Sequence, residues 1–126
     1  MSIVSNVGAK LDLRLRQGAD FSTTLTFTNS DGSAVDLTGA TLAAEIRKGP
    51  GMSELLASFV VAICIPATLG TALMSLPAAV SALIPAVPDW LDEGASYWWD
   101  LELIDSAGEI SCPLYGKVFM LLEITR

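Results

Sequence analysis

Hydrophobic and polar residues alternate with a period of two along most of the chain, and this feature most limits its possible folds. In residues 10–16, Leu11, Leu13 and Leu15 alternate with charged residues, which is typical of a strand with one buried face. The same period predicts strands over residues 21–28, 41–48, 54–65, 71–76, 95–104, 109–115 and 117–124. Turn signals separate several of these strands, among them Asn29-Ser30-Asp31-Gly32 and Asp105-Ser106-Ala107-Gly108.

One segment, residues 77–84, has a helical pattern, since Pro77 suits a first helical position and Pro85 ends it. Seven or eight short strands with one short helix predict an all-β fold, an immunoglobulin-like antiparallel β-sandwich. The 126 residues fit one such domain, and we expect residues 1–9 to be an N-terminal arm. Pro113 predicts an edge strand or a bulge in the segment 109–115.

No charged residue lies between Glu54 and Asp89, although a small β-sandwich normally marks its solvated faces with charge. Two interpretations remain open. The segment is either a tightly packed, alanine-rich half of the domain, or a surface covered by another protein chain. The second predicts a protein interface that includes Leu55, Phe59, Val60, Val61, Met74, Trp90 and Trp98.

The sequence lacks the side chains that most catalytic and metal sites need. The absence of histidine excludes Ser-His-Asp, Cys-His and histidine-zinc sites, and two cysteines, which we expect to be free thiols, are too few for zinc. A net charge of −7 argues against binding to nucleic acid. We also expect no export signal and no membrane span, because the longest apolar run, residues 55–65, is about half of the length needed.

Acidic residues offer two weak candidate sites. Asp89, Asp92 and Glu93 could bind calcium, but their spacing is more typical of a solvated loop. Asp100 and Glu102 share one face of a predicted strand and could form the carboxylate pair of a sugar hydrolase. The solvated face of a strand is the simpler interpretation, so we expect no cofactor, no metal and no enzyme activity.

Tryptophan residues fall into two groups. Trp99 is in phase with the hydrophobic positions of its strand and is expected in the core, whereas Trp98 points the other way. Trp98 is either an interface anchor or covered by the loop that holds Trp90, and the two rings together could also stack on a sugar. Asp36 and Thr38 are expected to bond the local backbone and to fix a crossover between the sheets.

Several segments taken in order resemble a known family. They are Gln17-Gly18-Ala19-Asp20-Phe21, Val35-Asp36-Leu37-Thr38-Gly39-Ala40-Thr41-Leu42 with the following strand that ends in Ile46-Arg47 and a glycine turn, residues 70–76, residues 77–84, Tyr97-Trp98-Trp99-Asp100-Leu101-Glu102-Leu103 and residues 116–126. Together they look like the small β-sandwich virion proteins of tailed bacteriophages, and resemble the N-terminal domain of phage baseplate upper proteins. The resemblance covers about residues 10–126, and it includes an approach to the Tyr97 strand that is longer than the family usually has.

This resemblance implies a structural protein of the virion, assembled in the cytoplasm of the host bacterium, rather than an enzyme. Its expected position is the tail, the baseplate or the attachment of a fibre, and its partners are other virion proteins and copies of itself. A capsid-decorating (cement) protein and a carbohydrate-binding module remain as alternatives.

Overall fold

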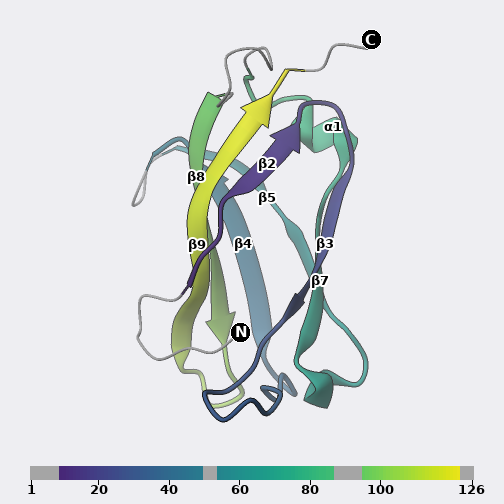
Figure 1. The fold of residues 1–126 in the computed structure, drawn as a ribbon, viewed down its shortest axis with the longest axis vertical. Coiled ribbons are helices and arrows are strands. Elements are labelled where there is room, and N and C mark those ends of the chain that lie inside the picture. The colour runs from purple at the N-terminus through teal and green to yellow at the C-terminus, as the bar shows by residue number, and fades with distance from the viewer. Residues whose placement is uncertain (1–8, 50–53, 87–94, 123–126) are drawn as a thin grey trace.

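The computed structural model describes residues 9–49, 54–86 and 95–122, which form two β-sheets and little helix (Figure 1). Sheet A has the strand order β1-β9-β8-β4-β5, with β2 also paired to β9. Its strands are β1 (Ala9–Lys10), β2 (Leu13–Arg16), β4 (Thr41–Arg47), β5 (Leu55–Ser58), β8 (Ala95–Ile104) and β9 (Ile110–Leu121). Sheet B has the order β3-β7-β6, with β3 (Phe21–Thr26), β6 (Val60–Ile63) and β7 (Thr71–Leu76). A 3-10 turn, η1 (Ala67–Leu69), and one short helix, α1 (Ala78–Ser81), complete the described elements.

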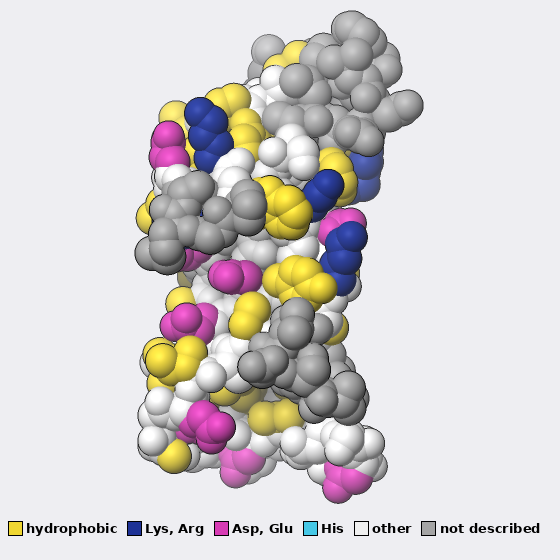
Figure 2. Space-filling view, turned by 90° about the vertical axis from the view of Figure 1, so that its left-hand side faces the viewer, with side chains coloured by type: hydrophobic (Ala, Val, Ile, Leu, Met, Phe, Trp, Pro, Cys, Tyr) yellow, Lys and Arg dark blue, Asp and Glu magenta, His cyan; other side chains and the backbone are white. Residues whose placement is uncertain are grey.

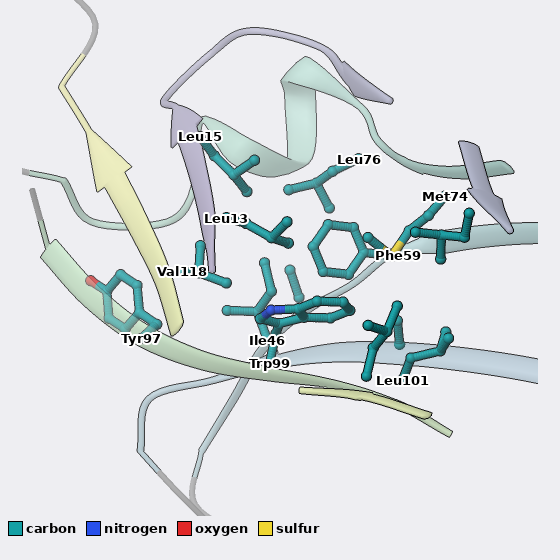
Figure 3. Packing of buried hydrophobic residues seen from close by; sticks show 14 of the residues in the cluster. Leu13, Leu15, Ile46, Phe59, Met74, Leu76, Tyr97, Trp99, Leu101 and Val118 are labelled. Carbon is teal, nitrogen blue, oxygen red and sulfur yellow. The ribbon is translucent and has the colours of Figure 1, made fainter. Parts of the chain in front are cut away.

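The two sheets face each other and share one hydrophobic core, as Figure 3 shows. Phe59 lies at its centre, where its ring meets Phe21 edge-on at 6.1 Å and Trp99 at 6.0 Å between centroids. Trp99 is 3% exposed, so the prediction that it lies in the core is confirmed. A mostly β structure with one short helix is therefore confirmed.

Sheet A is mixed, and here the prediction of a purely antiparallel fold is wrong. β1 and β2 pair parallel to β9, with Ala9 opposite Leu114 and Leu13 opposite Val118, whereas the other strand pairs are antiparallel. The parallel pairs join the two ends of the sequence. The local alternation of hydrophobic and polar residues shows which side chains of a strand face the core, but it does not show which distant strand pairs with it. It therefore could not predict the parallel pairs of β1 and β2 with β9.

The predicted strand over residues 54–65 is two strands in different sheets. β5 pairs with β4 in sheet A and β6 pairs with β7 in sheet B, and Phe59 lies at the junction, where its N–H donates to the Ala44 carbonyl at 2.9 Å. The alternation of side chains continues through the junction, which is why the pattern predicted a single strand. Ile65, which was included in the predicted strand, lies beyond the end of β6 and is 95% exposed.

β9 runs unbroken through Pro113 and Gly116, where two strands were predicted. Leu101 pairs with Leu114, and Leu103 pairs with Ser111. Between these two pairs β8 has one residue, Glu102, whereas β9 has two, Cys112 and Pro113. This arrangement is a β-bulge, as Pro113 predicted.

Gly116 allows the N-terminal strands to lie directly against β9. A Cβ atom at Gly116 would lie 2.1 Å from the Leu11 carbonyl oxygen, so that oxygen occupies the space of the missing side chain. The same oxygen accepts a hydrogen bond from Trp99 Nε1 at 2.7 Å. The Lys117 N–H donates instead to Asp12 Oδ1 at 3.0 Å. Between β1 and β2, the hydrogen bonds that hold this segment against its neighbours therefore include two side chains, those of Trp99 and Asp12.

Helix α1 is shorter than the predicted segment 77–84 and is fixed to the turn between β2 and β3. The Ala78 N–H donates to Asp20 Oδ1 at 2.7 Å. Ser81, which is 1% exposed, accepts a hydrogen bond from the Gly18 N–H at 3.0 Å and donates to the Ala19 carbonyl at 3.1 Å. These bonds close one end of the space between the sheets.

Candidate interaction surface

The outer face of sheet B carries no charge. None of its three strands, β3, β6 and β7, contains a charged residue. On β7, Leu73 is 43% exposed while its neighbours Ala72 and Met74 are fully buried, so alternate residues point outward. The register places Leu73 between Thr24 of β3 and Ala62 of β6. We call the outward residues of these strands the sheet B face: Ser22, Thr24, Thr26, Val60, Ala62, Thr71, Leu73 and Ser75.

Exposed hydrophobic side chains gather in the same part of the chain. Among the described residues, six of the eight large hydrophobic side chains that are exposed fall within residues 55–83: Leu55, Val60, Ile65, Leu69, Leu73 and Leu83. Val60 and Leu73 belong to the sheet B face, and the others lie on β5, on η1 or on connecting segments. Exposed apolar surface without charge is what binding sites for other proteins commonly present.

The outer face of sheet A is different, because charges and aromatic rings cover it. Figure 2 views the molecule from the side of β8 and β9, where acidic, basic and hydrophobic side chains alternate. Lys117 Nζ lies 5.4 Å from the centroid of the Trp98 ring, and the Arg14 guanidinium lies 6.0 Å from that of Phe119. Such cation–π contacts stabilise side chains at a surface by about 0.5–1 kcal/mol.

Two carboxyl groups on sheet A oppose each other across the strands. Asp100 of β8 is in register with Glu45 of β4, and Arg47 binds Glu45 at 2.9 Å. Burial, together with the negative charge of Glu45, raises the pKa of the Asp100 carboxyl, and Arg47 partly offsets this. Burial also raises the pKa of the Cys112 thiol, which with Cys64 is a free, half-buried cysteine.

Neither acidic candidate site gains support from this geometry. Asp89, Asp92 and Glu93 lie outside the described residues. Within residues 9–49, 54–86 and 95–122, no three side chains of histidine, cysteine, aspartate or glutamate come together in a way that could hold a metal ion. Asp100 and Glu102 lie on the exposed outer side of β8, as their strand phase predicted.

The residues predicted to form a protein interface lie in different places. Leu55 and Val60 are exposed, at 45% and 56%, on β5 and β6. Phe59 and Met74 are buried in the core and present almost no surface to a partner. Their hydrophobicity identified them, but hydrophobicity alone does not say toward which sheet a side chain points.

The remaining three predicted residues also lie in different parts of the molecule. Val61 is half-buried and packs against the core. Trp98 is half-buried on the opposite side of the molecule, on sheet A, and Trp90 lies outside the described residues. Leu73 and Thr24 of the sheet B face were not among the predicted residues, although the charge-free alternation of residues 21–28 and 71–76 could have indicated them.

The crossover from sheet B to sheet A is fixed as predicted. Asp36 Oδ1 accepts hydrogen bonds from the Thr38 N–H at 2.9 Å and from the Thr38 hydroxyl at 2.6 Å. These bonds lower the pKa of the exposed Asp36 carboxyl. The two residues therefore act locally, in the segment that joins β3 to β4.

A scan against protein-family models and a search of the curated proteins found no match. In the part of the chain that the structure describes, no helix has the length and apolar character needed to cross a membrane.

Proposed function

We propose that this protein is a structural component of a tailed bacteriophage particle. It acts by protein–protein assembly in the tail, the baseplate or the region where fibres attach, and its partners are other virion proteins and copies of itself. It is assembled in the cytoplasm of the host bacterium and catalyses no reaction. In this proposal the two sheets are an immunoglobulin-like sandwich.

The observation that carries the proposal is the contrast between the outer faces of the two sheets. The sheet B face has no charge, whereas the outer face of sheet A carries Arg14, Glu45, Arg47, Asp100 and Lys117. A protein that works alone in water has no need to keep one face free of charge and to expose leucine and valine there. A subunit that buries this face against a neighbour avoids the cost of desolvating charges.

The resemblance to phage virion proteins supports the same function. The segments that carry it fall at the turn between β2 and β3, at the β3–β4 crossover and on β4, on β7, at α1, on β8 and along β9. They therefore include strands of both sheets and two of the connections between strands.

A carbohydrate-binding module gains less support. Lys117 Nζ lies 5.4 Å from the centroid of the Trp98 ring, so one side of this ring is already in contact with a charged side chain. A sugar would have to displace Lys117 or use the other side of a ring that is only half exposed.

Particles purified on a density gradient test the proposal. Host cells that produce the phage encoding this chain should yield particles in which quantitative mass spectrometry finds the chain in a fixed ratio to the major capsid protein. Separated tails should contain it and tail-free heads should lack it, and the opposite distribution would favour a capsid-decorating protein. A chain that stays with the soluble proteins and is absent from particles would contradict both.

A further inference from the structure

We infer that β3 is the edge at which sheet B joins sheet B of a second copy, through antiparallel pairing of the two β3 strands about a two-fold axis. The inference deepens the proposed function, because it names one partner and one contact of the subunit. The two can fail separately, since the pairing of β3 is measured on the purified protein and the proposed function is tested in particles.

The register of β3 identifies the main-chain groups at its outer edge. Among the strands that the structure describes, β3 pairs only with β7. The Phe27 N–H donates to the Gly70 carbonyl at 2.8 Å, in continuation of this ladder. Main-chain groups alternate sides along an antiparallel strand, so those of the odd-numbered residues of β3 also point toward β7. The N–H and C=O groups of Ser22 and Thr24 therefore point away from β7, toward the edge.

The inner side of the sheet is incompletely covered next to this edge. Phe21 and Thr23 are only half-buried, whereas Leu76 and Met74, their partners on β7, are fully buried. The Phe21 ring nevertheless lies on the core side, 6.1 Å from the ring of Phe59. A further strand beside β3 would cover both half-buried side chains.

The other sheet edges carry features that oppose pairing with another chain. β2 exposes Arg14 and Arg16 at alternate positions, and β1 has only two residues. β5 and β6 have four residues each, and the register between β4 and β5 shifts. Natural proteins protect their sheet edges with charge, short strands and bulges. β3 has six residues, no charge, no proline and a continuous register, so this edge lacks such protection.

The sequence of β3 fits the same strand of a second copy. With Thr23 on the two-fold axis, Ser22 lies opposite Thr24 of the other copy, and the outward N–H and C=O groups of each can bond those of the other. Phe21 then lies opposite Leu25 of the other copy, on the inner side of the joined sheet. An axis perpendicular to the sheet keeps the inner sides of both copies together. Aromatic–aliphatic and threonine–threonine pairs across strands stabilise such a sheet.

Pairing through β3 also enlarges the sheet B face. Three strands spaced by about 4.8 Å and about 20 Å long present roughly 300 Å² per copy, whereas stable complexes bury about 800 Å² per partner. Two three-stranded sheets joined at β3 form one six-stranded sheet with a continuous uncharged face of roughly 600 Å². The pair therefore offers a neighbouring virion protein a surface closer to the size that a stable contact needs.

The contact through a single strand is small, so the pair should be weak in the purified protein and be strengthened by multivalency in a symmetric assembly. A disulfide across the axis captures a weak pair. In a chain with Cys64→Ala and Cys112→Ala, Thr23→Cys should form a covalent dimer in an oxidised glutathione buffer. Opposed residues of this kind have Cα atoms about 4.5 Å apart, within the range of a disulfide.

Ser22→Cys in the same chain is the matched control. Ser22 is more exposed than Thr23, but in the proposed register it is diagonal to Ser22 of the other copy, about 7–8 Å away. Disulfides do not bridge Cα atoms more than about 7 Å apart, so this variant should remain mostly monomeric. Non-reducing gel electrophoresis and mass spectrometry measure the covalent dimer in both variants.

Thr24→Pro tests the role of the main chain without a cross-link. Proline removes the Thr24 N–H, which points to the edge, and leaves the hydrogen bonds between β3 and β7 in place. Sedimentation velocity in a reducing buffer, at up to about 1 mM protein, should show the wild type shifting toward dimer. Thr24→Pro should raise the dissociation constant about tenfold or more, and Thr24→Val, which keeps the N–H, should dimerise like the wild type.

Circular dichroism establishes that each variant is folded, and the disulfide experiment decides the question if Thr24→Pro is not. The inference is overturned if Thr23→Cys gives no covalent dimer or cross-links no faster than Ser22→Cys. A wild type that stays monomeric up to about 1 mM, or a folded Thr24→Pro protein that dimerises as well as the wild type, would also overturn it.

Discussion

Replacing Gly116 with alanine should destabilise the fold strongly, because backbone atoms already occupy the place of the new methyl group. The added Cβ would lie 2.1 Å from the Leu11 carbonyl oxygen and 2.7 Å from the Leu11 carbonyl carbon. Ordinary contacts between such atoms are longer than 3.4 Å. The segment between β1 and β2 must therefore move by more than 1 Å, which separates Leu11 from Trp99 and Asp12 from Lys117.

The free energy of unfolding should fall by about 2–4 kcal/mol. The indole N–H of Trp99 is then left buried without its partner, at a cost of about 1–3 kcal/mol, and each lost hydrogen bond contributes about 0.5–1.5 kcal/mol. The usual gain from replacing glycine with alanine in a strand, about 0.5–1 kcal/mol, offsets part of this. At a slope near 2 kcal/mol per molar urea, the midpoint of unfolding should drop by roughly 1–2 M.

Urea unfolding followed by circular dichroism measures this change, and a double-mutant cycle with Trp99→Phe tests its cause. If Gly116→Ala acts through the bond between Trp99 and Leu11, the double variant should lose less stability than the sum of the two single variants. Gly32→Ala is the control, because Gly32 has a φ of 89° but no atoms within 4 Å of an added Cβ. Gly32→Ala should lower the free energy of unfolding by about 1–2 kcal/mol because of backbone strain, and this loss should simply add to that of Trp99→Phe. A Gly116→Ala protein within about 0.5 kcal/mol of the wild type, a change typical of surface positions without special features, would refute the reasoning.

Three further variants test other parts of the structure. Asp100→Asn should stabilise the fold at neutral pH by a few tenths to about 1 kcal/mol, because it removes a charge opposite Glu45. Since the folded-state pKa of Asp100 is raised, the charged carboxyl costs stability above that pKa and the cost disappears as the pH falls, so calorimetry should show the gain shrinking in acid. Asp36→Ala should lower the melting temperature at neutral pH. Because its bonds with Thr38 lower the folded-state pKa of Asp36, this difference should vanish as the pH falls through that pKa, and equal effects at every pH would contradict it. Ser81→Ala should lower the free energy of unfolding, measured with urea, by about 1–3 kcal/mol. An unchanged free energy of unfolding would mean that the buried hydrogen bonds of Ser81 to the β2–β3 turn do not stabilise the fold.

Strands with strict alternation between clear boundaries were predictable from the sequence. β7 and β8 have the bounds that the pattern predicts, because Gly70 and Pro77 enclose the first and the Asp105 turn ends the second. Pairing between distant segments was not predictable. The parallel position of β1 and β2 depends on contacts with the far end of the chain, such as the bond from Trp99 to Leu11, which leave no local periodicity.

The candidate surface was predictable in part. The absence of charge between Glu54 and Asp89 indicated an unusual surface, but it did not show that β3 would complete that surface. Phe59 and Met74 were predicted at an interface and are in the core, while Leu73 emerged only from the register of three strands. The pairing of strands decides which side of a hydrophobic segment faces the other sheet, and this information is absent from the pattern of one segment.

A cryo-EM map of the purified particle tests the central claim most directly. The account predicts density from a neighbouring protein chain over the sheet B face, in contact with Thr24, Leu73 and Ala62. It also predicts that the charged outer face of sheet A is not the main contact of the subunit. A subunit whose sheet B face lies open to solvent in the assembled particle would contradict the claim.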